Sequence, residues 1–174
     1  MSDKRPIRAA VITVSDKGHA GEREDVSGPL LADLLGKLGA KVVSQTILPD
    51  ERTEIERALV NLSDGAQVDL VVTTGGTGPA PRDITPEATR AIIQREMPGL
   101  AELLRFEGVR HTPLAVLSRG VAGIRGSTLI VNLPGSPRAV REGMETLTPV
   151  LPHAIKMLRG VDTEHHHEME TQHA

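Results

Sequence analysis

A glycine-rich segment that ends in an arginine and an aspartate is the part of this chain best suited to chemistry. Residues 73–86 read Thr-Thr-Gly-Gly-Thr-Gly-Pro-Ala-Pro-Arg-Asp-Ile-Thr-Pro and follow the apolar run 70–72. Glycines let backbone N–H groups approach a ligand, and Thr85 with Pro86 predicts the N-cap and first residue of a helix, whose N-terminus attracts phosphate. The segment therefore predicts an anion-binding pocket, with these candidate residues: Gly75, Gly76, Thr77, Gly78, Arg82 and Asp83.

Three further segments follow other expected strands, and they contain more candidate ligands. They are Ser15-Asp16, Pro49-Asp50 and Pro134-Gly135-Ser136. Open α/β sheets bind ligands at the carboxyl ends of their strands, so segments that are distant in sequence can meet over one crevice. There Asp50 and Asp83 could hold Mg²⁺ against the phosphates of a nucleotide, and Arg119 could pair with phosphate.

Each of these features also has a purely structural explanation. Three glycines can simply make a tight turn, and residues 134–137 can be a turn followed by a helix cap. Asp50 and Asp83 can cap helices or turns, and Arg82 and Arg119 can be solvated surface charges. The convergence of all these segments at one edge of a sheet is what favours a ligand site.

Strand and helix patterns alternate along the chain, which predicts an α/β fold. The pattern predicts strands over 9–14, 42–48 and 69–74, a hairpin over 121–125 and 128–133, and helices over 27–38, 53–62, 85–95, 98–107 and 136–158, the last interrupted by Pro149 and Pro152. The helix at 53 is expected to begin with a capping box made by Thr53 and Glu56. Right-handed crossovers then give a mostly parallel, mixed sheet covered by helices on both faces, with strand 42–48 near an edge.

Composition bounds the class of protein. The 174 residues are 39% apolar with a net charge of −3, no cysteine and one aromatic residue, Phe106. We expect one domain over residues 1–160 and a polar, disordered tail over 161–174, whose histidines have no catalytic role. Interspersed charges and missing aromatic platforms argue against nucleic acid as a partner, and the absence of a long apolar segment argues against a membrane. We expect a soluble, cytoplasmic protein.

Four motifs resemble the Mog/MoaB family of molybdopterin-binding proteins. They span residues 74–89, 117–119, 123–126 and 132–137, and the similarity extends from about residue 8 to residue 160. The first motif is highly specific. The resemblance implies a three-layer α/β/α sandwich that assembles as a homotrimer.

The chemistry implied by this resemblance is a nucleotidyl transfer in molybdenum cofactor biosynthesis. In that family the terminal phosphate of molybdopterin attacks the α-phosphate of ATP, with Mg²⁺ as cofactor, and pyrophosphate is released. Asp50 and Asp83 match the two acidic residues associated with catalysis, and Ser118 matches a serine of the ligand pocket. The loops 75–78 and 134–136 match the ligand-binding loops. Molybdopterin, ATP and other proteins of molybdenum cofactor biosynthesis are then the expected partners.

One segment of the sequence keeps an alternative to the transferase function open. Residues 22–28, Glu-Arg-Glu-Asp-Val-Ser-Gly, are more similar to the MoaB-like branch of the family. Some members bind the pterin without transferring AMP. The alternative function is therefore a non-catalytic molybdopterin-binding carrier protein.

Overall fold

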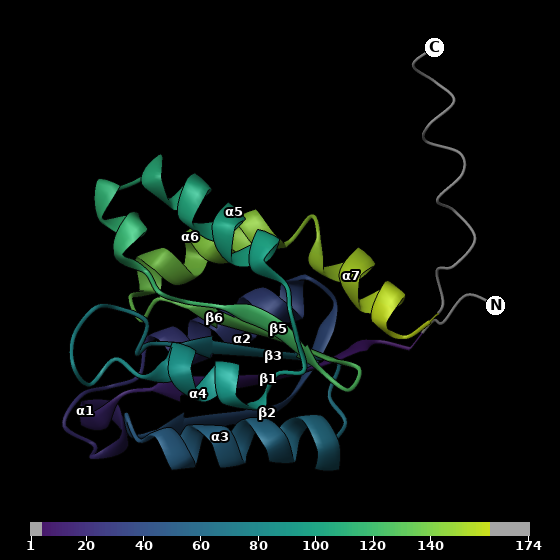
Figure 1. Ribbon diagram of the computed structural model, residues 1–174, viewed down its shortest axis with the longest axis horizontal. Coiled ribbons are helices and arrows are strands. Elements are labelled where there is room, and N and C mark those ends of the chain that lie inside the picture. The colour runs from purple at the N-terminus through teal and green to yellow at the C-terminus, as the bar shows by residue number, and fades with distance from the viewer. Residues whose placement is uncertain (1–4, 161–174) are drawn as a thin grey trace.

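A six-stranded sheet with the strand order β2-β1-β3-β6-β5-β4 forms the middle layer of the protein (Figure 1). The computed structural model describes residues 5–160, so the tail predicted over 161–174 lies outside the described residues. Strands β2, β1, β3 and β6 pair in parallel, whereas β5 pairs antiparallel with both β6 and β4. The strands are β1 (Ile7–Val14), β2 (Ala40–Leu48), β3 (Leu70–Thr74), β4 (Arg95–Glu96), β5 (Ala122–Arg125) and β6 (Thr128–Leu133). The predicted mostly parallel, mixed sheet is confirmed, with β2 at an edge.

Helices cover both faces of this sheet, as the three-layer prediction requires (Figure 1). The longer helices are α2 (Ser27–Lys37), α3 (Arg52–Val60), α4 (Thr85–Ile92), α5 (Pro98–Val109), α6 (Pro137–Leu147) and α7 (Leu151–Leu158). Alternate residues of β1 enter opposite cores: Ala9 and Val11 pack with α2, α5, α6 and α7, while Ala10 and Ile12 pack with α3 and α4. A strand buried on both faces needs a continuous apolar run, which is the pattern seen in the sequence.

Two of the predicted helix caps, at Thr85 and Thr53, are wrong. Helix α4 begins at Thr85 with Ile84 at the N-cap, and the Thr85 hydroxyl donates to the Gly75 carbonyl at 3.0 Å instead of capping. Helix α3 begins at Arg52, after Glu51, without a side-chain cap. Its Glu56 accepts from Arg52 Nε at 2.5 Å, so the capping box with Thr53 does not form. A loop carbonyl has thus replaced the predicted bond at Thr85, and a residue one turn away in the same helix has replaced the one at Glu56.

Two short helices lie in segments for which no helix was expected. Ser15 caps α1 (Asp16–His19) by accepting from the Gly18 amide at 3.1 Å. The 3₁₀ helix η2 (Pro113–Leu117) connects α5 to β5. Helix α4 also ends at Ile92, three residues before its predicted end, because the chain then forms the edge strand β4.

An ion pair joins the C-terminal helix to the sheet at the amino ends of the strands. Asp69, just before β3, accepts from Arg159 Nη2 at 2.6 Å and from the Arg8 amide at 2.7 Å. Arg159 also donates to the carbonyls of Arg5 and Pro6, at 3.0 and 3.1 Å. The end of α7 is thus tied to the beginning of β1.

No helix within residues 5–160 is long and apolar enough to cross a membrane.

Candidate functional site

The carboxyl ends of β1 and β3 border a cavity of about 790 Å³. The connection after β1 leads to β2 on one side of it, and the connection after β2 leads to β3 on the other, so the order of strands reverses here. Such a reversal opens a crevice at the strand ends where α/β proteins bind ligands. The antiparallel strand β5 begins at the same edge, because Ala122 pairs with Val131 near the end of β6. The segment before β5 therefore reaches the cavity too.

The loop over residues 75–83, called the glycine loop below, follows β3 and presents backbone donors to this cavity. Gly75 and Gly76 have φ values of +104° and +65°, and a Cβ on Gly75 would lie 2.2 Å from the Val14 carbonyl oxygen. Only glycine fits these two positions. The Gly75 amide donates to the Leu133 carbonyl at 3.0 Å. Among the residues that the structure describes, no acceptor is bonded to the amides of residues 76–78, which leaves them available to an anion.

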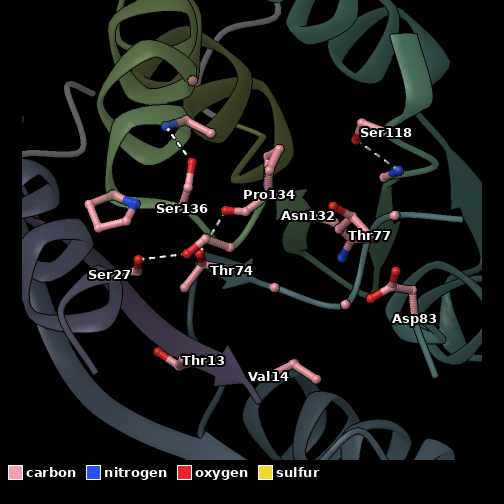
Figure 2. Close-up of a pocket in the computed structure, with 18 of the residues that line it drawn as sticks. Thr13, Val14, Ser27, Thr74, Thr77, Asp83, Ser118, Asn132, Pro134 and Ser136 are labelled. Atoms are coloured by element: carbon pink, nitrogen blue, oxygen red, sulfur yellow. Dashed lines mark hydrogen bonds between the residues drawn. The ribbon is translucent and has the colours of Figure 1, made fainter. Parts of the chain in front are cut away.

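The loop after β6 is fixed against the glycine loop. The hydroxyl of Thr74 donates to the Pro134 carbonyl at 2.8 Å, and the hydroxyl of Ser27 donates to the Gly135 carbonyl at 2.7 Å (Figure 2). Ser136 caps α6 by accepting from the Ala139 amide at 3.1 Å. The positive N-terminus of α6 therefore adjoins the glycine loop at the cavity wall, an arrangement suited to phosphate.

Asp50 enters the cavity from the segment after β2. It is held by a reciprocal pair of bonds, because the Asp16 amide donates to Asp50 Oδ2 at 2.9 Å and the Asp50 amide donates to Asp16 Oδ1 at 3.0 Å. Burial raises the pKa of the half-buried Asp50 carboxyl, and the negative charges of Asp16 and Asp83 add to this effect. Folding therefore places Asp50 where a cation would be favoured.

Asp83 reaches the same cavity from the end of the glycine loop. Its Oδ2 accepts from the Ala80 amide at 3.0 Å and lies beneath Gly78, where an added Cβ would approach it to 2.7 Å. Figure 2 places Asp83 on the side of the cavity where Thr77 and Ser118 also lie. The Ser118 hydroxyl accepts from the Gly120 amide at 3.3 Å.

Most of the residues predicted for the site are brought together. The predicted residues that line the cavity are Ser15, Asp50, Gly75, Gly76, Thr77, Gly78, Asp83, Ser118, Pro134, Gly135 and Ser136. They come from segments after β1, β2, β3 and β6 and from the segment before β5. The convergence on which the sequence argument depends is present, and the chemical role of each residue stays a prediction.

Three predicted site residues are not among those that line the cavity: Asp16, Arg82 and Arg119. Arg82 donates to Asp16 at 2.7 Å and to Glu51 at 2.9 Å, so its charge is already paired. Arg119 is bonded to Glu87 and to loop carbonyls. These residues support the wall of the cavity from outside, whereas the prediction placed both arginines against phosphate.

The cavity lining includes five charged residues that were not predicted for the site: Arg23, Glu24, Asp25, Arg105 and Glu142. Two of them bond to neighbouring parts of its wall. Asp25 accepts from the Thr13 hydroxyl at 2.7 Å and from the Gly28 amide at 2.9 Å. Arg105, on α5, donates to the Ser118 and Gly120 carbonyls at 3.3 and 3.0 Å. Helical spacing could have found Arg105, since it shares one helix face with the cavity residues Ala101, Leu104 and Gly108.

Carboxylates outnumber cations along the cavity. The acidic lining residues are Glu24, Asp25, Asp50, Asp83 and Glu142, and the basic ones are Arg23 and Arg105. Within residues 5–160 no three metal-binding side chains form a cluster that could by itself hold a metal ion. A phosphate-bearing ligand would thus find backbone donors and a helix N-terminus on one wall and carboxylates on another.

Comparison with known proteins agrees with this geometry. Residues 10–153 match the family described as "Probable molybdopterin binding domain". The chain is 44% identical over 156 residues to a molybdopterin adenylyltransferase of Helicobacter pylori strain J99, covering 88% of this chain and 89% of the relative. It is 42% identical over 141 residues to a molybdopterin adenylyltransferase of Escherichia coli K12, covering 80% of this chain and 72% of the relative.

A solved structure extends the similarity to three dimensions. The crystal structure of the molybdopterin biosynthesis enzyme MoaB from Thermus thermophilus superimposes with a TM-score of 0.84 at 51% identity, covering 88% of this chain and 97% of the other. The family match over residues 10–153 runs from β1 into α7 and so includes the loops that border the cavity. The chain therefore belongs to the molybdopterin-binding domain family, as the motifs in its sequence predicted.

Proposed function

We propose that this protein is a molybdopterin adenylyltransferase of molybdenum cofactor biosynthesis. In the proposed reaction an oxygen of the terminal phosphate of molybdopterin forms a bond to the α-phosphorus of ATP. The bond from that phosphorus to the oxygen shared with the β-phosphate breaks, and the bonding electrons leave with pyrophosphate. The product is adenylylated molybdopterin.

The observation that carries this proposal is that two carboxylates and two phosphate-binding elements border the same cavity. The free amides of residues 76–78 and the N-terminus of α6 offer places for phosphate groups. Asp50 and Asp83 border the space beside them. Nucleotidyl transfer needs little covalent help from a protein beyond aligning two phosphates and neutralising the charge that develops. This cavity has the parts for alignment, and neutralisation requires a cation.

The carboxylate pair fits magnesium by the chemistry of its oxygens. Mg²⁺ is held in many phosphate-transfer sites by one or two carboxylates together with substrate phosphates, so a larger protein cage is unnecessary. We propose Asp50 and Asp83 as its protein ligands. Without a cation these carboxylates would repel both phosphate-bearing substrates. When bound, Mg²⁺ supplies charge neutralisation at the reacting phosphates.

Neither carboxylate is needed as a general base in this scheme. A phosphate monoester is already ionised at neutral pH, so its oxygen can attack without losing a proton to the protein. The Asp16 amide fixes one oxygen of Asp50, and the Ala80 amide fixes one oxygen of Asp83. The role that we propose for both side chains is therefore to bind and orient.

The test is a direct assay for pyrophosphate. Protein, ATP, Mg²⁺ and molybdopterin are mixed, and pyrophosphate release is measured with and without the pterin. We expect release that requires molybdopterin and is abolished by a chelator of Mg²⁺. Pterin binding without any pyrophosphate release would refute the transferase and support the alternative, a carrier protein that binds the pterin without reaction.

We also propose that the protein assembles as a homotrimer, as its resemblance to the family implies. An apolar surface on α5 and η2 supports self-association. It consists of Phe106, Val109, Leu114, Val116 and Leu117, and Phe106 and Leu114 are both 68% exposed. Light scattering after size exclusion should give three times the chain mass of 18.6 kDa, and Phe106→Asp should lower it. A wild-type mass of one chain would contradict the trimer.

A further inference from the structure

We propose that Arg119 and Glu87 form a clamp that positions the glycine loop and Asp83, and that Arg119 is not itself a phosphate ligand. Within the described residues, the Arg119 side chain contacts the loop from outside the cavity. The kinetic part of this inference rests on the proposed transferase function. The structural part concerns the protein without any ligand.

Arg119 is bonded to the loop through both its backbone and its side chain. Its amide donates to the Thr77 carbonyl at 2.8 Å, Nε donates to the Gly78 carbonyl at 2.8 Å, and Nη2 donates to the Asp83 carbonyl at 2.5 Å. Nη1 donates to the Glu87 carboxylate. Each nitrogen of the guanidinium group therefore has an acceptor within the protein.

These bonds orient the loop donors. In a trans peptide the C=O and the following N–H point in opposite directions, and no cis peptide occurs within residues 5–160. Because the Thr77 carbonyl is turned toward Arg119, the Gly78 amide is turned away from Arg119. Gly78 lines the cavity. The backbone amide of Arg119 thereby aims a free N–H group at the space where an anion would bind, and its side chain holds the next carbonyl of the loop, that of Gly78.

The same clamp fixes Asp83 through its main chain. Arg119 holds the Asp83 carbonyl, while the Asp83 amide donates to the Ala80 carbonyl at 2.9 Å. The Asp83 carboxylate accepts from the Ala80 amide. With its carbonyl, amide and one carboxylate oxygen all bonded, Asp83 has little freedom to change its direction. A charged group must be held within a fraction of an ångström to orient a metal ion or a phosphate.

Glu87 distinguishes a clamp from a phosphate ligand. It lies in the first turn of α4 and is absent from the residues that line the cavity. Its carboxylate neutralises Arg119, and the hydrogen bond from Arg119 lowers the pKa of Glu87 from its usual range. If Arg119 bound phosphate, removing Glu87 would free the guanidinium and help catalysis. If Arg119 is a clamp, removing Glu87 must harm catalysis in the same way as altering Arg119.

The experiment compares Arg119→Lys, Glu87→Ala, their double variant and Glu87→Gln with the wild-type protein. Hydrogen exchange of the segment 79–86 is measured without ligand, and kcat for pyrophosphate release is measured with substrates. The clamp predicts faster exchange at the bonded amides of this segment and a kcat that falls about 100-fold in Arg119→Lys and in Glu87→Ala. The double variant should be no worse than either single variant, and Glu87→Gln, which keeps an acceptor, should recover part of the loss.

The matched control removes an ion pair of similar geometry elsewhere. Arg125 donates to Asp64 at 3.0 and 2.6 Å, beyond the residues that line the cavity. Asp64→Asn should leave both the exchange of segment 79–86 and kcat unchanged. Normal exchange in Arg119→Lys, or a kcat that is unchanged or increased in Glu87→Ala, would overturn the clamp. If the wild-type protein releases no pyrophosphate, the proposed function fails, and the exchange measurements still decide the inference.

Discussion

The Asp50 carboxylate is proposed to be needed for activity, but its position in the fold lowers stability. Its pKa is raised, first by burial and then by the charges of Asp16 and Asp83. A carboxyl whose pKa rises on folding adds stability while it is protonated and loses that contribution as the pH rises through the folded pKa. The ionised form at neutral pH therefore opposes folding.

The variant Asp50→Asn tests this balance. We expect a higher melting temperature than wild type at about pH 7, a smaller difference at about pH 4, and turnover lowered about 100-fold. Melting curves at both pH values and the pyrophosphate assay measure these quantities. A lower melting temperature at both pH values would mean that the carboxylate is mainly a structural acceptor for the Asp16 amide.

Single residues also mark what sequence reasoning can find. Asp50 and Asp83 follow parallel strands, and strand polarity alone places them at one edge of the sheet. Whether an arginine faces a ligand or a carboxylate of its own protein depends on neighbours that are distant in sequence. Arg82 and Arg119 were assigned to phosphate for lack of that information. Arg105 was missed although it lies on a helix face with other residues of the cavity.

The sequence predicts which segments form helices and strands better than it predicts where each helix or strand begins and ends. Strand patterns and helical spacing identified the main helices and the four strands that pair in parallel, including the partly polar β2. The cap at Thr85 failed because its hydroxyl bonds to the Gly75 carbonyl in the loop after β3, and the capping box failed because Glu56 bonds to Arg52 within the same helix. Short helices such as α1 and η2 show no repeating pattern in the sequence, and each begins at a side-chain cap, where Ser15 and Thr112 accept from a backbone amide.

The glycine loop offers a prediction at this scale. A Cβ at Gly78 would contact only Asp83, with Oδ2 at 2.7 Å and Cγ at 3.6 Å, so Gly78→Ala must displace this carboxylate. We expect turnover to fall about 100-fold and the free energy of unfolding to fall by about 1 kcal/mol, since one hydrogen bond to Asp83 is lost. Urea denaturation and the pyrophosphate assay measure the two effects.

A second glycine serves as the control for this substitution. Gly36 is exposed on α2, and a Cβ there would meet no atom within 4 Å. Gly36→Ala should keep full turnover and raise stability slightly, because alanine favours a helix. Equal turnover in Gly78→Ala and Gly36→Ala would contradict the role given to Asp83.

In the whole molecule, a buried ion pair and the candidate site lie at opposite ends of the strands. The Asp69 ion pair lies before β3, whereas the cavity lies after it. The side chains of Arg159 and Asp69 are only 7% and 16% exposed, so Asp69→Asn should lower the free energy of unfolding by about 2 kcal/mol and leave turnover unchanged.

An exposed ion pair provides the comparison for Asp69. Lys37 and Asp33 are 71% and 59% exposed, and Asp33→Asn should change stability by less than about 0.5 kcal/mol. Denaturant titration of both variants gives the difference. A similarly small change in Asp69→Asn would show that the buried ion pair of Asp69 and Arg159 contributes little to the free energy of unfolding.

The grip of Arg159 on the Arg5 and Pro6 carbonyls brings residues 5 and 160 into the same neighbourhood. A few added residues could join these positions into a loop, and new chain ends could then be opened in an exposed turn such as Gly126. Because residues 5 and 160 are close together, the domain could also be inserted into a loop of another protein. Its cavity, at the other ends of the strands, would then face away from that protein.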